Sequence, residues 1–560
     1  MQKTCKQCGS GFEVTEEDMA FYDKVSPVFG GKKYQIPPPT LCSDCRQQKR
    51  MTFRNERKLY KDKCDLTGKE MVSCFPPESS LTVYSQEAFW SDKWDPKELG
   101  RDYDFSKSFF QQMSELIASV PQIALLNTQT ENSEFCHRIY DGRNNYMSII
   151  ALYAPENLLY TYYTMTCKDS TDTAFNQYCE LCYETIDAEH CYNCLYGLRI
   201  RNCKDSYFLE DCIGCTNCFG CKNLHQKQYC IFNEQKTKDE YDQFIQSCAF
   251  GSLSAVKKMR KECDDFFLKL PNRPKMMIDA EGVTGADVYH CRDSIELYDW
   301  YESERMTFCA LGEKSHDCMD CYGMGYGEFC YDSITIQYTN HSLFCATVIN
   351  TNDLIYCYEC YADSSSCFGC SSMKKGKYCI LNKQYSKDEY EELVPKIIEH
   401  MQSTGEWGEF FPIELSPFAY NETVAQEYFP LTKEEVEAND WKWRDEKDEI
   451  PKVEKIIKAS QLPDSIDDIP DDVLNWAIEC EVTSRPFRIV KQELEFYRRM
   501  KLPIPHLHPD ERHKRRMALR NPRKLWNRQC DKCGKDIQTT YAPERPETVY
   551  CEECYLKEVY

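Results

Sequence analysis

The sequence predicts a multi-domain, β-rich α+β protein: two duplicated short-period β-solenoid (β-helix-like) arrays with helical caps, and a cysteine knuckle at each end. The first observation is a twelve-residue spacing of cysteine or serine in the middle of the chain. Two rows share this spacing, namely Cys167, Cys179, Cys191, Cys203 and Cys215, and three residues later Ser170, Cys182, Cys194, Ser206, Cys218 and Cys230. A short fixed period is typical of one unit that repeats and buries its face only against its neighbours.

The second observation is a further copy of the same pattern. Cys309, Cys321, Ser333, Cys345 and Cys357 again lie twelve residues apart, with Cys318, Cys330 and Ser342 in the companion row. Both arrays end in Cys-Phe-Gly-Cys followed by Lys-Asp-Glu-Tyr, at 218–241 and 367–390. This predicts an internal duplication. Narrow right-handed coils are the preferred interpretation, and short hairpins with cysteine knuckles are the alternative, because twelve residues could span half a coil.

Each array is followed by a helix-start signal. Thr237-x-x-Glu240 and Ser386-x-x-Glu389 both match a capping box, in which side chain and backbone at a helix start satisfy each other's hydrogen bonds. A second helix is expected around 252–269, before Pro271. These helices would cover the last coil of each array, which repeat proteins require.

These signals divide the chain into seven segments. They are an N-terminal knuckle domain (1–75), a mixed α and loop connector (76–135), the first array (136–235), a helical cap and linker (236–284), the second array (285–384), a helical cap with an acidic connector (385–475), and a basic segment with a C-terminal knuckle (476–560).

Composition narrows the class of protein. The 560 residues carry a net charge of −22 and include 36 cysteines, a number that would ordinarily suggest disulfides in an exported protein. The N-terminus, however, has no apolar core of a signal peptide, and no apolar run approaches the ~18 residues of a membrane span. We therefore expect a cytoplasmic protein that does not contact membranes, with reduced thiols that serve as metal ligands or as small buried side chains.

The terminal cysteine pairs are the strongest chemical signal. The C-terminal set is Cys530, Cys533, Cys551 and Cys554, and the N-terminal set is Cys5, Cys8, Cys42 and Cys45. Two CxxC turns supply the four thiolates of a closed, tetrahedral structural zinc site. The sequence therefore predicts about two structural zinc ions, and more only if the arrays bind metal.

The array cysteines allow two interpretations. Cys179, Cys182, Cys191 and Cys194 could form an additional metal site between adjacent strands, which lie about 4.8 Å apart. The preferred alternative is an inward row of small thiols that only pack, because serine replaces cysteine at several positions of both rows. Cys64 and Cys74 are interpreted as ordinary thiols, with half of a further site as the alternative.

Basic residues lie next to both knuckles and predict a polyanion contact. The candidate nucleic-acid-binding residues are Arg50, Arg54, Arg57, Lys58, Arg512, Arg515, Arg516, Arg520, Arg523 and Lys524. Clustered positive charge beside a rigid turn suits a phosphate backbone, and RNA or a ribonucleoprotein is the expected partner. The alternative is that these faces dock onto the protein's own acidic segment, 433–475.

No sharp catalytic motif is present. The chain has no GxSxG elbow, no HExxH and no Walker lysine, so an enzyme is the less favoured class. The leading hypothesis is a zinc-stabilised scaffold that binds RNA, with a protein partner on the array faces as a further possibility. The alternative is a thiol-rich metal store or redox protein, including an iron–sulfur protein, that uses the array cysteines.

Some stretches carry a family resemblance. Arg54-Asn-Glu-Arg57 with Cys64-Asp-Leu-Thr-Gly68, Asn521-Pro-Arg-Lys-Leu-Trp526 and Thr540-Tyr-Ala-Pro-Glu-Arg-Pro546 resemble an uncharacterised cysteine-rich, zinc-ribbon-containing family of candidate-phylum bacteria. The knuckles are also similar to zinc ribbons and treble clefs. The resemblance implies zinc at both ends of the chain and implies little about function.

Overall fold

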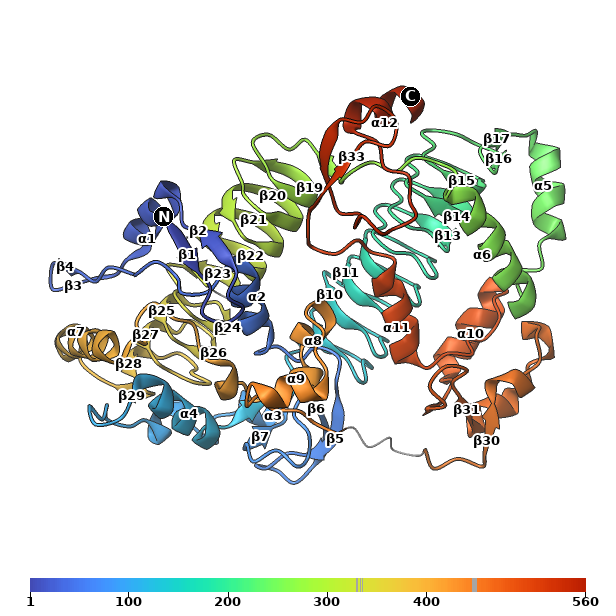
Figure 1. The fold of residues 1–560 in the computed structure, drawn as a ribbon. Helices are drawn as coiled ribbons and strands as arrows, with labels where there is room; N and C mark the ends of the chain where they lie inside the picture. The colour runs from blue at the N-terminus through green and yellow to red at the C-terminus, as the bar shows by residue number, and fades with distance from the viewer. Residues whose placement is uncertain (329–330, 333, 335, 446–450, 560) are drawn as a thin grey trace. The chain divides into compact units, whose positions relative to one another are not determined.

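The computed structural model describes residues 1–328, 331–332, 334, 336–445 and 451–559, and the chain divides into two compact units. Unit 1 combines Met1–Leu125 with Lys275–Asp445, and unit 2 combines Leu126–Pro274 with Glu446–Tyr560. Each unit therefore contains one array and one terminal knuckle segment: the second array with the N-terminal segment, and the first array with the C-terminal segment (Figure 1).

The N-terminal part of unit 1 consists of short hairpins and short helices. Its elements are β1 (Gln2–Thr4), β2 (Gly11–Glu13), α1 (Glu16–Val25), β3 (Val28–Phe29), β4 (Lys32–Lys33), α2 (Ser43–Met51), β5 (Tyr60–Lys63), β6 (Glu70–Ser73), β7 (Val83–Tyr84), α3 (Gln86–Phe89), η1 (Pro96–Leu99), α4 (Phe109–Ser119) and β8 (Gln122–Ile123).

The second array forms one 12-stranded sheet, β18 to β29, and the capping helix α7 follows it. The strands are β18 (Met277–Ile278), β19 (Gly285–Arg292), β20 (Leu297–Thr307), β21 (Ala310–Met319), β22 (Tyr322–Glu328), β23 (Ile336–Asn340), β24 (Ala346–Ile349), β25 (Asn352–Ile355), β26 (Tyr358–Tyr361), β27 (Ser365–Phe368), β28 (Lys377–Ile380) and β29 (Lys383–Gln384). The remaining elements of unit 1 are α7 (Lys387–Thr404), η2 (Ile413–Leu415), η3 (Tyr420–Glu422), α8 (Val424–Tyr428) and α9 (Lys433–Ala438).

Unit 2 starts with the first array, whose strands fall into a four-stranded sheet, β9 to β12, and a five-stranded sheet, β13 to β17. The strands are β9 (His137–Ile139), β10 (Ile149–Leu152), β11 (Tyr162–Met165), β12 (Ala174–Gln177), β13 (Tyr192–Leu195), β14 (Lys204–Glu210), β15 (Phe219–Lys222), β16 (Cys230–Ile231) and β17 (Glu234–Gln235). The remaining elements are α5 (Lys238–Ser247), α6 (Leu253–Phe267), β30 (Lys455–Lys458), η4 (Ala459–Gln461), η5 (Ile466–Asp468), η6 (Asp471–Asn475), β31 (Trp476–Glu479), β32 (Pro486–Phe487), α10 (Lys491–Met500), α11 (Pro509–Ala518), β33 (Trp526–Gln529), β34 (Asp536–Thr539) and α12 (Glu552–Val559).

The twelve-residue spacing of the sequence is the usual register of the parallel strand pairs. Cys194 pairs with Ser206 on the next strand, and Tyr207 pairs with Phe219 on the one after. Each array contains a step of thirteen residues, at Ile149–Tyr162 in the first and at Asn352–Ser365 in the second. Residues of one row therefore come to lie next to each other on successive strands.

A left-handed backbone at every third residue keeps the strands of the first array short. From Gln129 to Phe232, with one extra residue at Tyr153–Ala154, every third position has a positive φ between 46° and 66°. A residue in this conformation turns the chain, because its φ is far from the extended value of a strand. The strands of the first array have only two to seven residues, and several include such a position, for example Asn193 in β13 and Asp205 and Phe208 in β14.

The fold-class prediction of two duplicated β-solenoids is therefore wrong. The structure is α+β, with open, mostly parallel sheets of different size in the two arrays, separate small hairpins, and helices between them. No closed sheet is found in the described ranges. The physical reason is the backbone, which takes a left-handed conformation inside the strands as well as between them, so that much of the first array pairs only through short strands and isolated bridges. A cysteine spacing reveals a register but not the backbone angles.

The array thiols point inward and donate hydrogen bonds to backbone carbonyls. The Sγ of Cys179 lies 3.2 Å from the carbonyl oxygen of Gln177 and 3.4 Å from that of Ala188. Ser206 donates in the same way to the carbonyl of Lys204, at 2.8 Å. Burial raises the pKa of the Cys136 thiol to about 12, so this thiol stays protonated. Two positions of the predicted rows, Ser333 and Cys330, lie outside the described residues.

Helices and apolar side chains cover one side of each array. In unit 1, Phe109 and Met113 of α4 and Val394 of α7 belong to one buried cluster with Phe344 and Tyr356 of the array. In unit 2, side chains of α6 and α10 form a comparable cluster with the first array. Both capping boxes are present, because Thr237 and Ser386 accept hydrogen bonds at the starts of α5 and α7.

None of the helices in the described part of the chain is long and apolar enough to cross a membrane.

The packing role of the array thiols can be tested with Cys194→Ser. The hydroxyl can donate to the carbonyl that the thiol uses, as Ser206 does, and the smaller side chain leaves only a small void. We expect a loss of about 1–2 kcal/mol in the free energy of unfolding and no change in metal content. Denaturant unfolding and elemental analysis measure both. Loss of bound metal would contradict a packing role.

Candidate metal centres and the helices beside them

The second four-cysteine group, formed by Cys530, Cys533, Cys551 and Cys554, is assembled by a hairpin and a helix. Cys530 and Cys533 lie in the turn between β33 and β34, where Gly534 has a φ of 74°. That positive φ favours glycine. Cys551 immediately precedes α12, and Cys554 lies in its first turn. The backbone N–H of Cys551 donates to the Sγ of Cys530 at 3.1 Å.

The local field around Cys530 favours a thiolate. Burial opposes ionisation, but the backbone N–H groups of Cys551 and Cys533 point at the sulfur and lower the pKa of Cys530 to about 6. A thiolate is the form that binds metal. The hairpin turn and the helix start therefore favour a thiolate at Cys530, whereas the hydrogen bond with Cys551 raises the pKa of Cys554 to about 12.

The first four-cysteine group, formed by Cys5, Cys8, Cys42 and Cys45, has the same construction. Cys5 and Cys8 lie in the turn of the β1–β2 hairpin, and Cys42 is the residue at which α2 starts, with Cys45 in its first turn. Beside the sulfurs, only Leu41 and the half-buried Phe12 contribute apolar contacts to this cluster. The hairpin turn and the start of α2 therefore have few apolar contacts with each other apart from the cysteines.

Both groups have the dimensions of a tetrahedral four-thiolate site. Within each group all four sulfurs lie within 4.8 Å of one another. The Cys8–Cys42 and Cys533–Cys551 sulfur distances are 3.7 Å and 3.8 Å. Metal–sulfur bonds of about 2.3 Å in a tetrahedron place sulfurs about 3.8 Å apart. The two groups predicted from the sequence could therefore hold metal ions.

The four array thiols Cys179, Cys182, Cys191 and Cys194 do not meet this geometry. Within the described ranges, only the two terminal groups bring three or more potential ligands within 4.8 Å of one another. The array thiols instead donate to carbonyl oxygens of their own and the following strand. This arrangement is that of packing thiols, and it gives no support to a metal store in the first array.

The helix α2, which begins at the first four-cysteine group, also carries the arginines that bind the second array. The Nε of Arg46 lies 2.8 Å from Asp320, and its Nη1 donates to the carbonyl of Leu41 at 2.7 Å. One turn later, Arg50 pairs with Asp332 and lies 3.5 Å from Asp320. These side chains are at most 5% exposed. The pairs are therefore almost completely removed from water.

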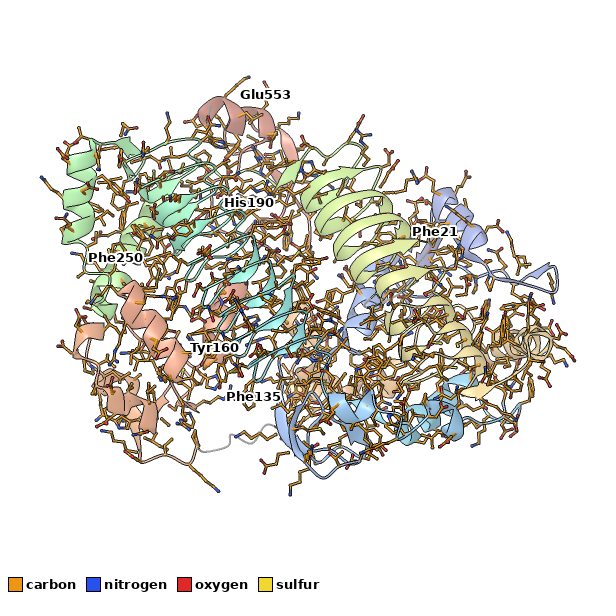
Figure 2. All side chains as sticks on the ribbon, turned by 180° about the vertical axis from the view of Figure 1, so that it is seen from behind. Phe21, Phe135, Tyr160, His190, Phe250 and Glu553 are labelled. Carbon is orange, nitrogen blue, oxygen red and sulfur yellow. The ribbon has the colours of Figure 1, made fainter. Side chains whose placement is uncertain are left out.

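The helix α11 makes an equivalent contact with the first array in unit 2. Arg512 and Arg516, one turn apart, both pair with Asp172, at 2.6 Å and 2.5 Å. The guanidinium of Arg512 also lies 4.3 Å from the ring centre of Tyr160, which Figure 2 marks on this array. Just beyond the helix, Arg520 contacts both carboxylate oxygens of Asp187 at 3.0 Å. Three arginines therefore hold α11 and the residues after it against the first array.

These contacts decide where the predicted nucleic-acid-binding residues lie. Five of the ten residues are buried in the ion pairs and ring contacts of their own unit, namely Arg50, Arg54, Arg512, Arg516 and Arg520. Three others are half-buried and engaged within the protein, namely Arg57, Lys58 and Arg523. Arg515 and Lys524 are exposed.

The alternative interpretation, docking onto an acidic segment of the same chain, has partial support. Arg498 pairs with Asp471 at 2.6 Å, and Lys501 pairs with Asp467 at 3.0 Å. These pairs are largely exposed. The buried arginines instead use carboxylates of the arrays.

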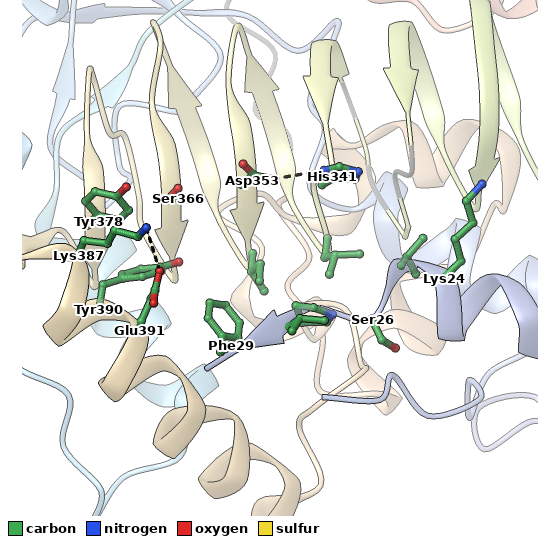
Figure 3. A pocket seen from close by; sticks show the side chains of 15 residues that line it. Lys24, Ser26, Phe29, His341, Asp353, Ser366, Tyr378, Lys387, Tyr390 and Glu391 are labelled. Carbon is green, nitrogen blue, oxygen red and sulfur yellow. Dashed lines mark ion pairs between the residues drawn. The ribbon is translucent and has the colours of Figure 1, made fainter. Parts of the chain in front are cut away.

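A separate pocket of about 410 Å³ lies in unit 1 between the β3–β4 hairpin, the second array and α7 (Figure 3). Phe29 and Tyr390 form an apolar side, and the array contributes His341, Asp353 and Ser366. The Nδ1 of His341 lies 3.4 Å from Asp353, and both side chains are about 60% exposed. The polar pair on the array side of the pocket is therefore open to solvent.

Sequence reasoning missed the aspartates that receive the arginines. Asp172 and Asp320 lie at positions with a φ of 55° and 62°, where Asp and Asn are among the most tolerant residues after glycine. A signal was present, because both are one step of twelve residues beyond an aromatic residue, Tyr160 and Phe308, that also contacts an arginine. On each array, the aromatic residue and the aspartate twelve positions later therefore contact arginines of the same helix.

Comparison of the chain with protein-family models and with curated proteins finds no match.

The second four-cysteine group can be tested with Cys551→Ser. Removing one of four ligands should release one metal ion per chain and unfold 526–559, because a structural metal site contributes on the order of 10 kcal/mol of folding free energy. Metal analysis and limited proteolysis read out the two effects. Cys248→Ser, outside both groups, is the control. Unchanged metal content and protease resistance in Cys551→Ser would refute the assignment.

The buried contact with the first array can be tested with Asp172→Asn. Asparagine tolerates the positive φ, so the variant removes charge without backbone strain. It removes the carboxylate that two buried guanidinium groups share, and we expect unit 2 to lose about 3–5 kcal/mol of stability. Asp169→Asn is the matched control, because Asp169 also has a positive φ but pairs with a half-exposed Arg499. It should cost at most about 1 kcal/mol.

Denaturant unfolding, with hydrogen exchange of first-array amides to assign the transition to unit 2, measures both variants. Equal costs for Asp172→Asn and Asp169→Asn would show that the buried pairs do not hold the helix.

Proposed function

We propose that this protein is a zinc-stabilised binding scaffold that contacts RNA or a ribonucleoprotein through exposed basic residues beside its second four-cysteine group. The single observation that carries the scaffold part is the pair of four-sulfur groups with tetrahedral spacing, each between a hairpin and a helix start. Zinc is the metal that all-cysteine, tetrahedral structural sites typically hold.

The site is suited to a structural role rather than to catalysis by the metal. Four thiolates fill the coordination shell of zinc, so no position is left for a water molecule or a substrate. When bound, the ion supplies cross-linking of hairpin and helix. Aspartates of the arrays then hold the helices α2 and α11 in place through their arginines.

The RNA contact rests on the basic side chains that the fold leaves exposed. Lys514 and Arg515 are exposed on α11. Lys524 precedes the hairpin of the second four-cysteine group, and Lys535 lies in the turn of that hairpin. The ammonium of Lys524 lies 5.4 Å from the ring centre of Trp526. Cationic and aromatic side chains side by side are suited to a single-stranded phosphate backbone and its bases.

The RNA proposal is tested with Lys514→Glu, Arg515→Glu and Lys524→Glu combined. These side chains are exposed, so the fold should survive, and binding to single-stranded RNA should weaken by about tenfold or more at low salt. Each lost phosphate contact lowers the slope of log affinity against log salt by about 0.7, so three should lower it by about 2. Fluorescence anisotropy in a salt series measures both quantities.

The control is Lys491→Glu, an exposed lysine on α10 that pairs with Glu495 in the next turn. It reverses a charge of unit 2 away from the second four-cysteine group. If the triple variant and the control bind RNA with the same affinity and salt slope, the RNA proposal is wrong. The metal assignment does not depend on this result.

A further inference from the structure

A further hairpin in unit 1 repeats the second four-cysteine group, with most of its sulfurs replaced. The run Arg57-Lys58-Leu59-Tyr60 precedes Cys64-Asp65, and Arg523-Lys524-Leu525-Trp526 precedes Cys530-Asp531 at the same spacing. Both cysteines are followed, four and five residues on, by Gly-Lys. All these positions lie 466 residues apart, and the same separation relates the arginine pairs of α2 and α11. The two terminal segments are therefore copies of each other.

The backbone hydrogen bonds of the two hairpins agree. The N–H of Asp65 donates to the carbonyl of Val83 at 3.0 Å, and that of Asp531 donates to the carbonyl of Val549 at 3.0 Å. The N–H of Ser85 lies 3.2 Å from the Sγ of Cys64, as that of Cys551 lies 3.1 Å from the Sγ of Cys530. We name these modules knuckle B (60–88) and knuckle D (526–554).

A corresponding module in unit 2 repeats the first four-cysteine group. Cys480 lies between β31 and β32, and the N–H of Glu481 donates to the carbonyl of His506 at 3.1 Å. In the first four-cysteine group, the N–H of Lys6 donates to the carbonyl of Thr40 at 3.1 Å. The helix starts at His508 in one module and at Cys42 in the other. We name these modules knuckle A (2–45) and knuckle C (476–511).

Knuckles B and C each retain one of the four sulfurs. The ligand positions hold Cys64, Thr67, Ser85 and Ala88 in knuckle B, and Cys480, Thr483, His508 and Glu511 in knuckle C. Neither set brings three potential ligands within 4.8 Å in the described part of the chain. Each terminal segment therefore contains one knuckle that could hold metal and one that could not.

An apolar cluster replaces the metal in the two modified knuckles. Knuckle B encloses Val83 with Phe75 and the distant Phe418. In knuckle C, Ile478, Cys480 and the neighbouring residues 487–507 belong to the large buried cluster of unit 2. In knuckle A, Tyr22, Ile36 and other side chains between the two cysteine pairs join the large buried cluster of unit 1, but the cysteines and the start of α2 cluster only with Leu41 and the half-buried Phe12. The contact between the hairpin turn and the start of α2 in knuckle A therefore depends on the sulfurs and their metal, whereas apolar side chains support knuckles B and C.

The knuckle with four cysteines adjoins the array-binding helix in unit 1, whereas the array-binding helix of unit 2 adjoins a knuckle with one cysteine. From this difference we propose a metal-dependent latch, meaning that bound metal keeps α2 in contact with the second array. In unit 1, α2 starts directly after Cys42 and carries Cys45 together with the arginines that bind Asp320 and Asp332. In unit 2, α11 belongs to the metal-free knuckle C. Loss of metal, or oxidation of the thiolates to disulfides by an oxidant such as a peroxide, releases α2 from the second array and leaves α11 in place. The inference rests on the proposed metal binding at the first four-cysteine group.

The test compares the zinc-loaded full-length chain with the same protein after chelation under reducing, anaerobic conditions. Hydrogen exchange is measured for peptides that cover α2 and α11, and metal content is measured in parallel. We expect α2 amides to lose protection by about a hundredfold or more, because their opening no longer requires release of a bound ion, and α11 amides to remain unchanged. Chelation that removes metal and leaves both helices equally protected overturns the latch. A chain that holds no zinc before chelation refutes the proposed function instead.

A gain of metal tests the equivalence of the knuckles independently. The combined variant Thr67→Cys, Ser85→Cys and Ala88→Cys restores the four sulfurs of knuckle B. It should raise the metal content from two to three ions per chain. Adding Cys64→Ser to this variant removes the fourth ligand and should return the content to two. A folded triple variant that still binds two ions shows that knuckle B is not a copy of a metal site.

Discussion

The left-handed backbone at every third residue of the first array, which recurs at many described positions of the second, is the constraint on which the rest of the structure depends. An L-residue in this conformation costs on the order of 1 kcal/mol, so the repeated turn requires compensation. Backbone hydrogen bonds to the following and the preceding repeat provide this compensation. The N–H of Thr171 donates to the carbonyl of Cys182, and that of Asp172 donates to the carbonyl of Leu159. The aspartates that receive the arginines occupy such turns. The docking positions of the helices are therefore a consequence of the turns.

Buried ion pairs of this kind specify a position more than they add stability. Removing an arginine and an aspartate from water costs nearly as much as their attraction returns, whereas a misplaced helix would leave a charge buried alone, at about 3–5 kcal/mol. Arg512 and Arg516 share Asp172, and Arg46 and Arg50 share Asp320. The array repeats every twelve residues and offers similar surfaces at each repeat. The shared aspartate therefore fixes the repeat against which each helix lies.

The sequence predicts local features of this protein better than distant ones. The four-cysteine groups and the capping boxes at Thr237 and Ser386 follow from residues close in sequence, and the structure contains them. The solenoid prediction was wrong because row spacing does not reveal the angle at each turn. The basic segments looked like an exposed surface because their partners are remote: Arg50 meets Asp332, 282 residues away. No local pattern distinguishes a buried arginine from a solvated one.

The four knuckles also show two physical solutions to one problem. A hairpin and a helix start of about thirty residues enclose too little apolar area to remain folded alone. Thiolates solve this with a bound ion, and the result is conditional, because metal binding competes with protons and oxidants for the sulfurs. Apolar side chains such as Phe75 or Phe487 solve it by joining a larger cluster, and that solution holds as long as the unit is folded. The position of the conditional knuckle therefore matters. In unit 2 the metal-binding knuckle ends at α12, after the array-binding helix α11, whereas in unit 1 it ends at the array-binding helix α2 itself. Only the contact of α2 with its array therefore depends on metal, protons and oxidants in the solution.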